Sequence, residues 1–322
     1  MSAPQKPRHF LDLRDLDSAT LRHILSCAQR FKRGEMDSNL LRGKVLALIF
    51  EKPSTRTRVS FEVAMRRLGG SSLILSDRDM QLGRGETIAD TARVLSRYVD
   101  AIMLRTDRVW KLDDLATHAT IPVINGLTEA SHPCQLMADI MTFEEHRGPV
   151  AGQKLAWIGD GNNVARSMVE AAVRFGFTLS VAAPESCDLP QNVYDWAERE
   201  NGQIQRTRDP KEAVKGARAV VTDSWLSMSD DPGRTTHLAL AAYQVTEELM
   251  AHAEKDAIFM HCLPAHRGEE VTGAVFDGPR SVVFDEAENR LHAQAGILAW
   301  VFGGFRLGFL GFWLRKARAL PP

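Results

Sequence analysis

The sequence predicts an α/β fold in two domains, each a parallel sheet flanked by helices. Short apolar runs of strand length alternate along the chain with longer segments whose apolar residues recur with helical spacing. The chain has 322 residues, more than one compact core normally holds. The pattern is interrupted at Gly148-Pro149, so we expect one domain over residues 1–148 and another over residues 149–322.

Four apolar runs in the first half are predicted to be strands: Val45–Phe50, Leu73–Leu75, Ala101–Leu104 and Ile121–Ile124. A helix is expected to begin near Ser54 and to end at Gly69-Gly70. A second helix is expected to begin at Thr87, which forms a capping-box pattern with Asp90. A third is expected to begin at Ser131 and to end before the break between the domains.

Five runs in the second half are predicted to be strands: Leu155–Ile158, Thr178–Ala182, Ala219–Thr222, Ile258–His261 and Val282–Phe284. Four segments are predicted to be helices: Asn163–Phe175, Val193–Glu200, Thr246–Ala253 and a last one from about Ala287. In open parallel sheets, ligands bind at the carboxyl ends of the strands. Arg105, Asp223 and Cys262 each directly follow a predicted strand, which makes them candidate site residues.

The charge balance indicates a protein with no long-range attraction to nucleic acid. The chain carries 40 basic and 41 acidic residues, for a net charge of −1. An anion site must therefore be local, built from a few converging donors. The four cysteines form no C-x-x-C pair, so we expect no zinc site, and isolated thiols suggest a reducing compartment. With no apolar signal core in residues 1–10, we expect a cytoplasmic protein.

One apolar segment, residues 296–314, approaches the length of a membrane span. Five glycines weaken any helix there, and Arg306 near its centre would cost about 2.5–3.5 kcal/mol on insertion. We therefore expect a buried terminal helix, followed by a tail that packs on the protein or on another subunit, rather than contact with a membrane.

The segment from Phe50 to Phe61 has the features of a phosphate site. A strand, a tight turn and a helix start follow one another, and unpaired N–H groups at a helix start attract anions. Ser54, Thr55 and Thr57 add hydroxyl groups, and Arg56 can bind phosphate oxygens with its forked guanidinium. The alternative is an ordinary capping serine followed by surface arginines.

Three further polar residues lie where they could reach the same ligand. Arg105 ends a strand in apolar surroundings, and its alternative role is an ordinary ion pair. His132 opens a helix, which it could simply cap, or it could hydrogen-bond a carbonyl or phosphate oxygen. Gln135, one turn later, carries an amide that distinguishes N–H from C=O groups.

Taken in order, these motifs resemble one known family. Residues 54–58 (Ser-Thr-Arg-Thr-Arg) and 132–135 (His-Pro-Cys-Gln) are similar to the carbamoyl-phosphate half of the aspartate and ornithine transcarbamoylases. Residues 81–87 and 90–95 resemble that family's mobile loop and its helix, and the match runs from about residue 10 to residue 303. The resemblance implies that the phosphate is held by Ser54, Thr55, Arg56 and Thr57, and that the carbamoyl group is reached by Arg105, His132 and Gln135.

The resemblance also implies an assembly. Gln81 would reach carbamoyl phosphate across a subunit boundary, which would make the site a property of a homotrimer. The terminal helix would link back to the first domain and pack on it. The two substrates would be carbamoyl phosphate and a small amino acid, and no metal or organic cofactor would be required.

The second half resembles the ornithine branch of the family. Residues 223–228 (Asp-Ser-Trp-Leu-Ser-Met) are similar to its ornithine loop, and residues 261–264 to its His-Cys-Leu-Pro motif, although Ser224 and residues 229–233 depart from the usual pattern. The resemblance implies ornithine binding by Asn163, Asp223, Ser227 and Met228. It implies that the carbamoyl-phosphate site is completed by Cys262, Leu263 and Arg290.

The implied reaction transfers the carbamoyl group to the side-chain amine of ornithine, giving citrulline and phosphate. Arg56, Arg105, His132, Asp223 and Cys262 would be its catalytic residues, with the acid holding the ammonium group and the sulfur near the attacking nitrogen. Three alternatives stay open: a transcarbamoylase that uses another amine, a catalytically silent relative, and a nicotinamide oxidoreductase. The last rests on the Gly159–Asn163 turn, which lacks the third glycine of a dinucleotide fingerprint.

Overall fold

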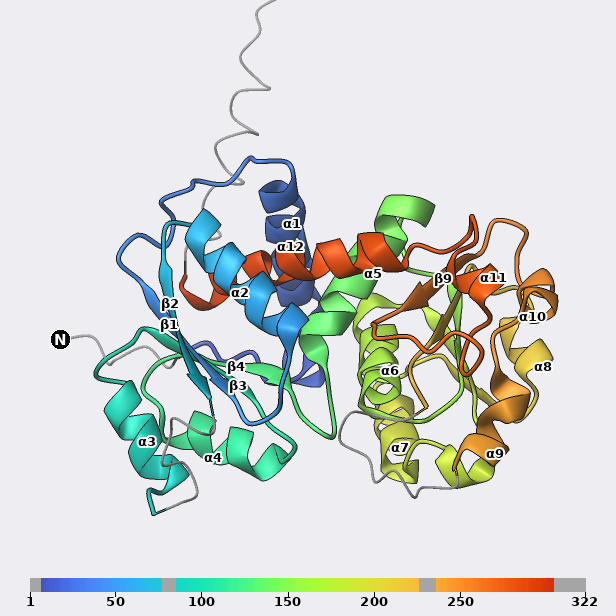
Figure 1. The fold of residues 1–322 in the computed structure, drawn as a ribbon, viewed down its shortest axis with the longest axis horizontal. Helices are drawn as coiled ribbons and strands as arrows, with labels where there is room; N and C mark the ends of the chain where they lie inside the picture. Colours follow the sequence, from blue (N-terminus) through green and yellow to red (C-terminus); the bar gives the residue numbers. More distant parts are fainter. Residues whose placement is uncertain (1–6, 77–84, 226–235, 304–322) are drawn as a thin grey trace, which may run out of the picture.

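The computed structural model describes residues 7–76, 85–225 and 236–303, which form two α/β lobes side by side (Figure 1). The first lobe contains, in chain order, η1 (Leu13–Asp15), α1 (Ser18–Lys32), β1 (Val45–Phe50), α2 (Thr55–Arg67), β2 (Ser71–Ser76), α3 (Ile88–Leu95), β3 (Ala101–Arg105), α4 (Val109–His118), β4 (Val123–Leu127) and α5 (Pro133–Arg147).

The second lobe repeats the alternation of strand and helix. It contains β5 (Lys154–Ile158), α6 (Asn163–Phe175), β6 (Thr178–Ala182), η2 (Glu185–Cys187), α7 (Gln191–Arg199), β7 (Ile204–Thr207), α8 (Pro210–Val214), β8 (Ala219–Thr222), α9 (Thr236–Leu240), η3 (Ala241–Tyr243), α10 (Glu247–Ala251), β9 (Ile258–His261), α11 (Gly273–Phe276) and α12 (Val283–Val301).

Each lobe is built on a parallel sheet, with the order β2-β1-β3-β4 in the first and β7-β6-β5-β8-β9 in the second. The register aligns the carboxyl ends of neighbouring strands. Phe50 at the end of β1 pairs with Arg105 at the end of β3, and Thr222 at the end of β8 pairs with His261 at the end of β9. The polar residues that follow these strands therefore meet at two sheet edges.

Helix α12 ties the two lobes together. It begins beside β9 of the second lobe and then packs against α1, α2 and α5 of the first, as the red helix across the middle of Figure 1 shows. Gly296 lies where α12 packs closely against α1, since a Cβ there would be 2.5 Å from the Ile24 carbonyl oxygen. The predicted fold class, two parallel-sheet domains with a terminal helix that returns to the first, is confirmed.

One predicted strand is wrong. Val282–Phe284 is not a strand, because α12 begins at Val283, and only Ser281 forms an isolated bridge, to Phe259. Three apolar residues in a row cannot distinguish a buried helix start from a short strand. The acids Asp285 and Glu286 in the first turn favour a helix start. The predicted helix start at Thr87 is confirmed, since the Thr87 side chain accepts the Asp90 N–H.

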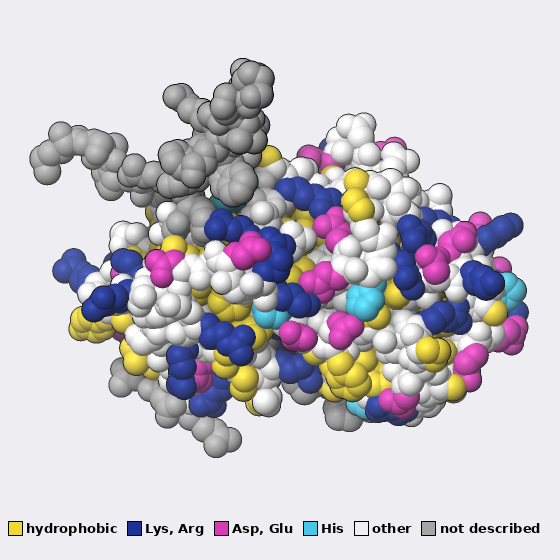
Figure 2. All heavy atoms as spheres, turned by 90° about the horizontal axis from the view of Figure 1, so that it is seen from above, with side chains coloured by type: hydrophobic (Ala, Val, Ile, Leu, Met, Phe, Trp, Pro, Cys, Tyr) yellow, Lys and Arg dark blue, Asp and Glu magenta, His cyan; other side chains and the backbone are white. Residues whose placement is uncertain are grey.

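The surface agrees with the balanced composition. Basic and acidic side chains are interspersed over the face shown in Figure 2. Within the described residues, no helix combines the length and the apolar character needed to cross a membrane. Most of the predicted apolar tail, from residue 304 onward, lies outside the described residues.

Adding one methyl group at Gly296 should destabilise the fold. A Cβ there would lie 2.5 Å from the Ile24 carbonyl oxygen and 2.9 Å from the Ala28 nitrogen, so α1 would have to move. Overpacking of this kind costs about 1–3 kcal/mol, which exceeds the gain of up to about 1 kcal/mol from alanine's helix propensity. We expect Gly296→Ala to lower the urea midpoint of unfolding.

Gly273→Ala, at the start of α11, is the matched control. Its Cβ would be 3.9 Å from the nearest atom, in the Arg267 side chain, so the midpoint should barely move. Equal midpoints for wild type and Gly296→Ala would contradict the close packing of α1 on α12.

Candidate active site

The start of α2 has the geometry of an anion site. Ser54 is the N-cap residue with an extended backbone (φ −159°, ψ 103°), but its side chain makes no capping hydrogen bond. The N–H groups of the first turn are therefore not taken up by a cap. Thr55 and Arg56 are exposed, whereas Thr57 is buried with 1% of its surface accessible. The alternative of an ordinary capping serine is not what the structure shows.

Two guanidinium groups converge on the Thr57 hydroxyl. Arg105 Nη1, from the end of β3, lies 3.4 Å from Thr57 Oγ1, and Arg290 Nη2, from α12, lies 3.0 Å from it. Arg56, one residue before Thr57, donates from Nη2 to the Leu263 carbonyl oxygen at 2.7 Å. Both lobes thus contribute to one cluster of three cations, which we call the arginine cluster: Arg56, Arg105 and Arg290.

No carboxylate of the described residues forms an ion pair with the arginine cluster. Like charges about 6 Å apart repel by about 3 kcal/mol at an effective dielectric of about 20. Burial, and then the charges of Arg290 and Arg56, lower the pKa of Arg105 to about 10. The cluster therefore concentrates positive charge, and a small dianion bound there would offset the repulsion among the three arginines.

His132 lies next to the same cluster as a neutral imidazole. It is the N-cap residue of α5 without capping that helix through its side chain, and its backbone N–H donates to Ser167 Oγ at 2.8 Å. Burial lowers its pKa well below the usual value, and the three arginines lower it further. Among the described residues, buried Nδ1 has no hydrogen-bond partner.

Gln135 connects the arginine cluster to two acids. Its Oε1 accepts a hydrogen bond from Arg290 Nη1. Its Nε2 donates to Asp139 Oδ1 at 2.7 Å and to Glu286 Oε1 at 2.9 Å. All of these side chains are buried, so the amide has one fixed orientation within this network.

The second lobe brings an acid and a thiol together. Cys262 Sγ, just after β9, donates to Asp223 Oδ1, just after β8, at 2.9 Å. Burial and the Asp223 carboxylate raise the pKa of Cys262 well above its usual value, so the sulfur stays a thiol. Asn162 Nδ2 donates to the other carboxylate oxygen at 2.8 Å, and Ser224 N–H donates to Oδ1 at 2.8 Å.

Two backbone carbonyl oxygens accept hydrogen bonds that link the lobes. Leu263 has a left-handed backbone (φ +60°), and its N–H donates to His261 Nδ1 at 2.9 Å. This turn directs the Leu263 carbonyl oxygen to Arg56. Asn163 Nδ2 donates to the Thr128 carbonyl oxygen at 2.8 Å, so it links the start of α6 to the segment after β4.

A surface hollow of about 330 Å³ lies between α2 and α12, next to the arginine cluster. It is lined by Thr55, Arg56, Val59, Ser60, Val63, Ala287, Glu288, Arg290 and Leu291. Two of the three clustered arginines are therefore reachable from this side.

Asp223, His261 and Cys262 place metal-ligand atoms within 4.8 Å of one another. These atoms are already engaged, however. The thiol donates to the carboxylate, while His261 uses Nδ1 for the Leu263 N–H and Nε2 for Glu270. The arrangement is therefore a hydrogen-bonded network that positions the thiol and the acid.

The structure places most of the sequence-predicted site residues around two adjoining centres. Thr57, Arg56, Arg105, Gln135, Arg290, Leu263 and His132 surround the first, and Asp223 with Cys262 forms the second. Asn163 bonds Thr128, while its neighbour Asn162 holds Asp223. Gln81, Ser227 and Met228 lie outside the described residues.

Sequence reasoning missed four residues that hold the centres in place: Asp139, Glu286, Asn162 and Ser167. One signal was available for Asp139, which follows Gln135 by four residues and so lies on the same helix face. Glu286 is 151 residues from Gln135, and no local pattern connects the two.

Comparison with known proteins gives a consistent match. Residues 8–145 match the carbamoyl-P binding domain of aspartate/ornithine carbamoyltransferases, and residues 151–301 match their Asp/Orn binding domain. The chain is 59% identical over 300 residues to an ornithine carbamoyltransferase of Mesorhizobium japonicum, covering 92% of this chain and 99% of that protein. It is 58% identical over 307 residues to one from Rhodopseudomonas palustris, covering 94% and 99%.

Solved structures are similar in fold as well. The ornithine carbamoyltransferase of Pyrococcus furiosus superposes with a TM-score of 0.89 at 49% identity, over 94% of this chain and 100% of that one. The ornithine transcarbamoylase of Giardia lamblia gives a TM-score of 0.86 at 33% identity, over 94% and 100%.

The neutral state of His132 predicts a pH-dependent stability. The unfolded chain binds a proton near pH 6.5, but the folded protein does not, so stability falls as the pH decreases from 6.5 toward the lowered pKa of His132. Between about pH 7.5 and about pH 5.5, wild type should lose about 1 kcal/mol more than His132→Gln. Urea unfolding of both proteins at the two pH values measures this difference, and equal losses would show that folding does not lower the pKa of His132.

Proposed function

Because the chain belongs to the aspartate/ornithine carbamoyltransferase family, we propose that the arginine cluster binds carbamoyl phosphate and that Asp223 with Cys262 receives the amine. The chain transfers the carbamoyl group of carbamoyl phosphate to the side-chain amine of ornithine, giving citrulline and phosphate. The observation that carries the site assignment is the convergence of three guanidinium groups without a carboxylate partner among the described residues.

We propose that the phosphate sits at the start of α2. The first-turn N–H groups, the hydroxyls of Ser54, Thr55 and Thr57, and the guanidinium groups of Arg56 and Arg105 supply donors for its oxygens. A dianion at this point offsets the mutual repulsion of the cluster. The negative charge that grows on the leaving phosphate is held by the same groups.

We propose that the carbamoyl group lies beside His132, Gln135 and the Leu263 carbonyl. A neutral imidazole donates to the carbonyl oxygen without adding a fourth cation to the cluster, which fits the lowered pKa of His132. Arg105 and Thr57 also lie where an oxyanion would form, and donors of this kind are typically worth about 10²–10³ in rate. Attack by the neutral amine forms the C–N bond and a tetrahedral oxyanion. The C–O bond to phosphate then breaks, and one proton of the attacking nitrogen ends on the released phosphate.

We propose that Asp223 binds the ornithine ammonium group and that Cys262 lies near the attacking nitrogen. An alkyl amine has a pKa of about 10.4, so it must lose a proton before it can attack. The carboxylate attracts the cation, and its bonds to Asn162 and Cys262 fix its direction. Asn163 at the start of α6, together with Ser227 and Met228, completes the proposed ornithine site.

We further propose a cytoplasmic homotrimer in which Gln81 of a neighbouring subunit reaches carbamoyl phosphate. The division into a carbamoyl-phosphate domain (1–148) and an ornithine domain (149–322) belongs to the same proposal. The family matches over residues 8–145 and 151–301 support this division. The reaction serves arginine biosynthesis or, in reverse, arginine breakdown. The chemistry uses side chains and backbone groups alone.

Removing one cluster arginine should abolish turnover. Wild type given carbamoyl phosphate and ornithine should release phosphate and form the ureido product in equal amounts. Arg56→Ala should reduce turnover by at least about 10². Arg66→Ala, in the same helix but in an exposed pair with Glu62, is the control and should keep wild-type turnover. If acetylornithine or putrescine gave product and ornithine did not, the assignment of ornithine as the substrate would be wrong. Near-normal turnover of Arg56→Ala would contradict the assignment of Arg56 to the phosphate site.

Removing the Asp223 charge should affect one substrate more than the other. The loss of a hydrogen bond to a charged group costs about 1.5–3 kcal/mol, so Asp223→Asn should raise the KM for ornithine by about 10–100-fold. The KM for carbamoyl phosphate should change by only a few-fold. Steady-state kinetics with each substrate varied in turn measures both values. A similar loss for both substrates would argue against a specific role in amine binding.

A further inference from the structure

The amide of Gln135 lies between a hydrogen-bond donor and two hydrogen-bond acceptors. On one side, Arg290 donates to its Oε1, and on the other its Nε2 donates to Asp139 and Glu286. The side chain is 1% exposed, and the three partner side chains are buried as well. A flipped amide would place Oε1 against two carboxyl oxygens and the NH₂ group against a guanidinium cation. Both contacts would be repulsive, so only one orientation is stable.

The two acids form a pair. Asp139 on α5 and Glu286 on α12 are both buried, and Gln135 Nε2 donates to one oxygen of each, so the two carboxyl groups adjoin. Two adjoining buried carboxyl groups do not both ionise readily, so one proton is shared by the pair. Glu286 already accepts two N–H groups, from Gln135 Nε2 and from the His261 backbone at 2.9 Å. Oδ2 of Asp139 meets no donor among the described side chains. The shared proton therefore fits best on Asp139, from which it points to Glu286.

The surroundings raise the pKa of the pair above that of an ordinary carboxylic acid. Burial raises the pKa of Asp139 to about 7, and burial together with Asp139 raises that of Glu286. The other charged or titratable groups facing the pair are Arg290 on α12, Asp223 after β8 and Cys262 after β9. Of these, Arg290 favours ionisation of the pair, whereas Asp223 opposes it.

We propose that Asp139 and Glu286 are positioning residues that fix Gln135 with its carbonyl oxygen toward the ligand, so that the site selects a carbamoyl NH₂ group over an acyl methyl group of the same shape. A carbonyl oxygen has two lone pairs. One accepts from Arg290, and the other, which meets no donor among residues 7–76, 85–225 and 236–303, can accept an N–H of the carbamoyl group. An acetyl group offers no such donor. This inference rests on the proposed function, because it concerns the same carbamoyl-phosphate site.

The ligand pair for the test is carbamoyl phosphate and acetyl phosphate, which differ by NH₂ against CH₃. Binding of each is measured by calorimetry, and turnover with ornithine is measured from pH 6 to pH 10. Sites built to hydrogen-bond a group reject analogues that lack it. Wild type should bind carbamoyl phosphate at least about tenfold more tightly than acetyl phosphate.

Two variants distinguish a role in orienting Gln135 from a role in protein stability alone. In Glu286→Gln, the new amide has one oxygen in place of two, so it cannot accept at both positions from Gln135 and His261. The preference for carbamoyl phosphate should therefore fall to about threefold or less, with a lower kcat.

In Asp139→Asn, the amide oxygen still accepts from Gln135, and the NH₂ group donates to Glu286 as the shared proton does. Wild-type kcat should fall at high pH, because the shared proton is lost there. Asp139→Asn should keep the preference for carbamoyl phosphate, and its kcat should not show this fall.

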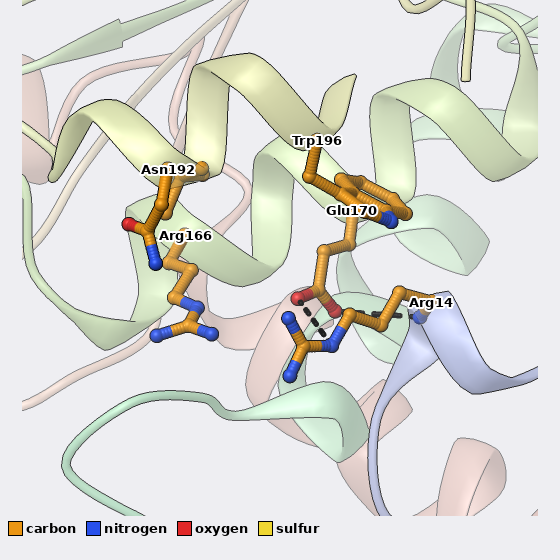
Figure 3. A pocket seen from close by; sticks show the side chains of 6 residues that line it. Arg14, Arg166, Glu170, Asn192 and Trp196 are labelled. Atoms are coloured by element: carbon orange, nitrogen blue, oxygen red, sulfur yellow. Dashed lines mark hydrogen bonds and ion pairs between the residues drawn. The ribbon is translucent and has the colours of Figure 1, made fainter. Parts of the chain in front are cut away.

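Glu170→Gln is the matched control for neutralising a buried acid. Glu170 on α6 is also buried, with its pKa raised to about 10, but it faces Arg14 and Asp12 rather than the arginine cluster, as Figure 3 shows for Arg14. This variant should keep the wild-type preference and the wild-type pH profile.

The outcomes are distinct. Wild type that forms no ureido product would refute the proposed function. An active wild type whose preference is unchanged in Glu286→Gln, or is lost equally in Asp139→Asn, would refute the positioning role alone. If Glu286→Gln does not fold, the pH profile of Asp139→Asn decides: a fall in kcat at high pH equal to that of wild type would refute the role of the shared proton.

Discussion

The site depends on three neighbouring guanidinium groups, two of which donate to one buried threonine, Thr57. Arg56, Arg105 and Arg290 come from α2, β3 and α12, and among the described residues no carboxylate neutralises them. Their repulsion is tolerated because the two lobes and the long terminal helix hold them in place. Burial, and then the same three positive charges, lower the pKa of His132 and keep it neutral. A small dianion is the ligand that this arrangement favours most.

The parallel sheets explain why the groups meet. Carboxyl ends of neighbouring strands are in register, so residues that follow β1 and β3 converge in one lobe, and those that follow β8 and β9 converge in the other. Helix α12 then adds Arg290, which donates to Thr57, and Glu286, which accepts from Gln135 and from the backbone N–H of His261. Because each lobe supplies only part of the site, the relative position of the lobes is part of the chemistry.

The sequence predicted what local patterns determine. Ser54–Thr57, Arg105, Asp223 and Cys262 were identified because each lies at a strand end or helix start, where apolar periodicity stops. The acid pair was not predicted, since Glu286 meets Gln135 only through the packing of α12 on α5. The same helix explains the incorrect strand prediction at Val282–Phe284. A short apolar run does not show whether its backbone forms a strand or the start of a helix.

The most direct test of the account is a crystal structure of the protein with carbamoyl phosphate bound. It should show the phosphate at the first turn of α2, with its oxygens within hydrogen-bond distance of Arg56 and Arg105, and the carbamoyl NH₂ facing Gln135. An occupied anion site elsewhere, with the arginine cluster left empty at saturating ligand, would contradict it.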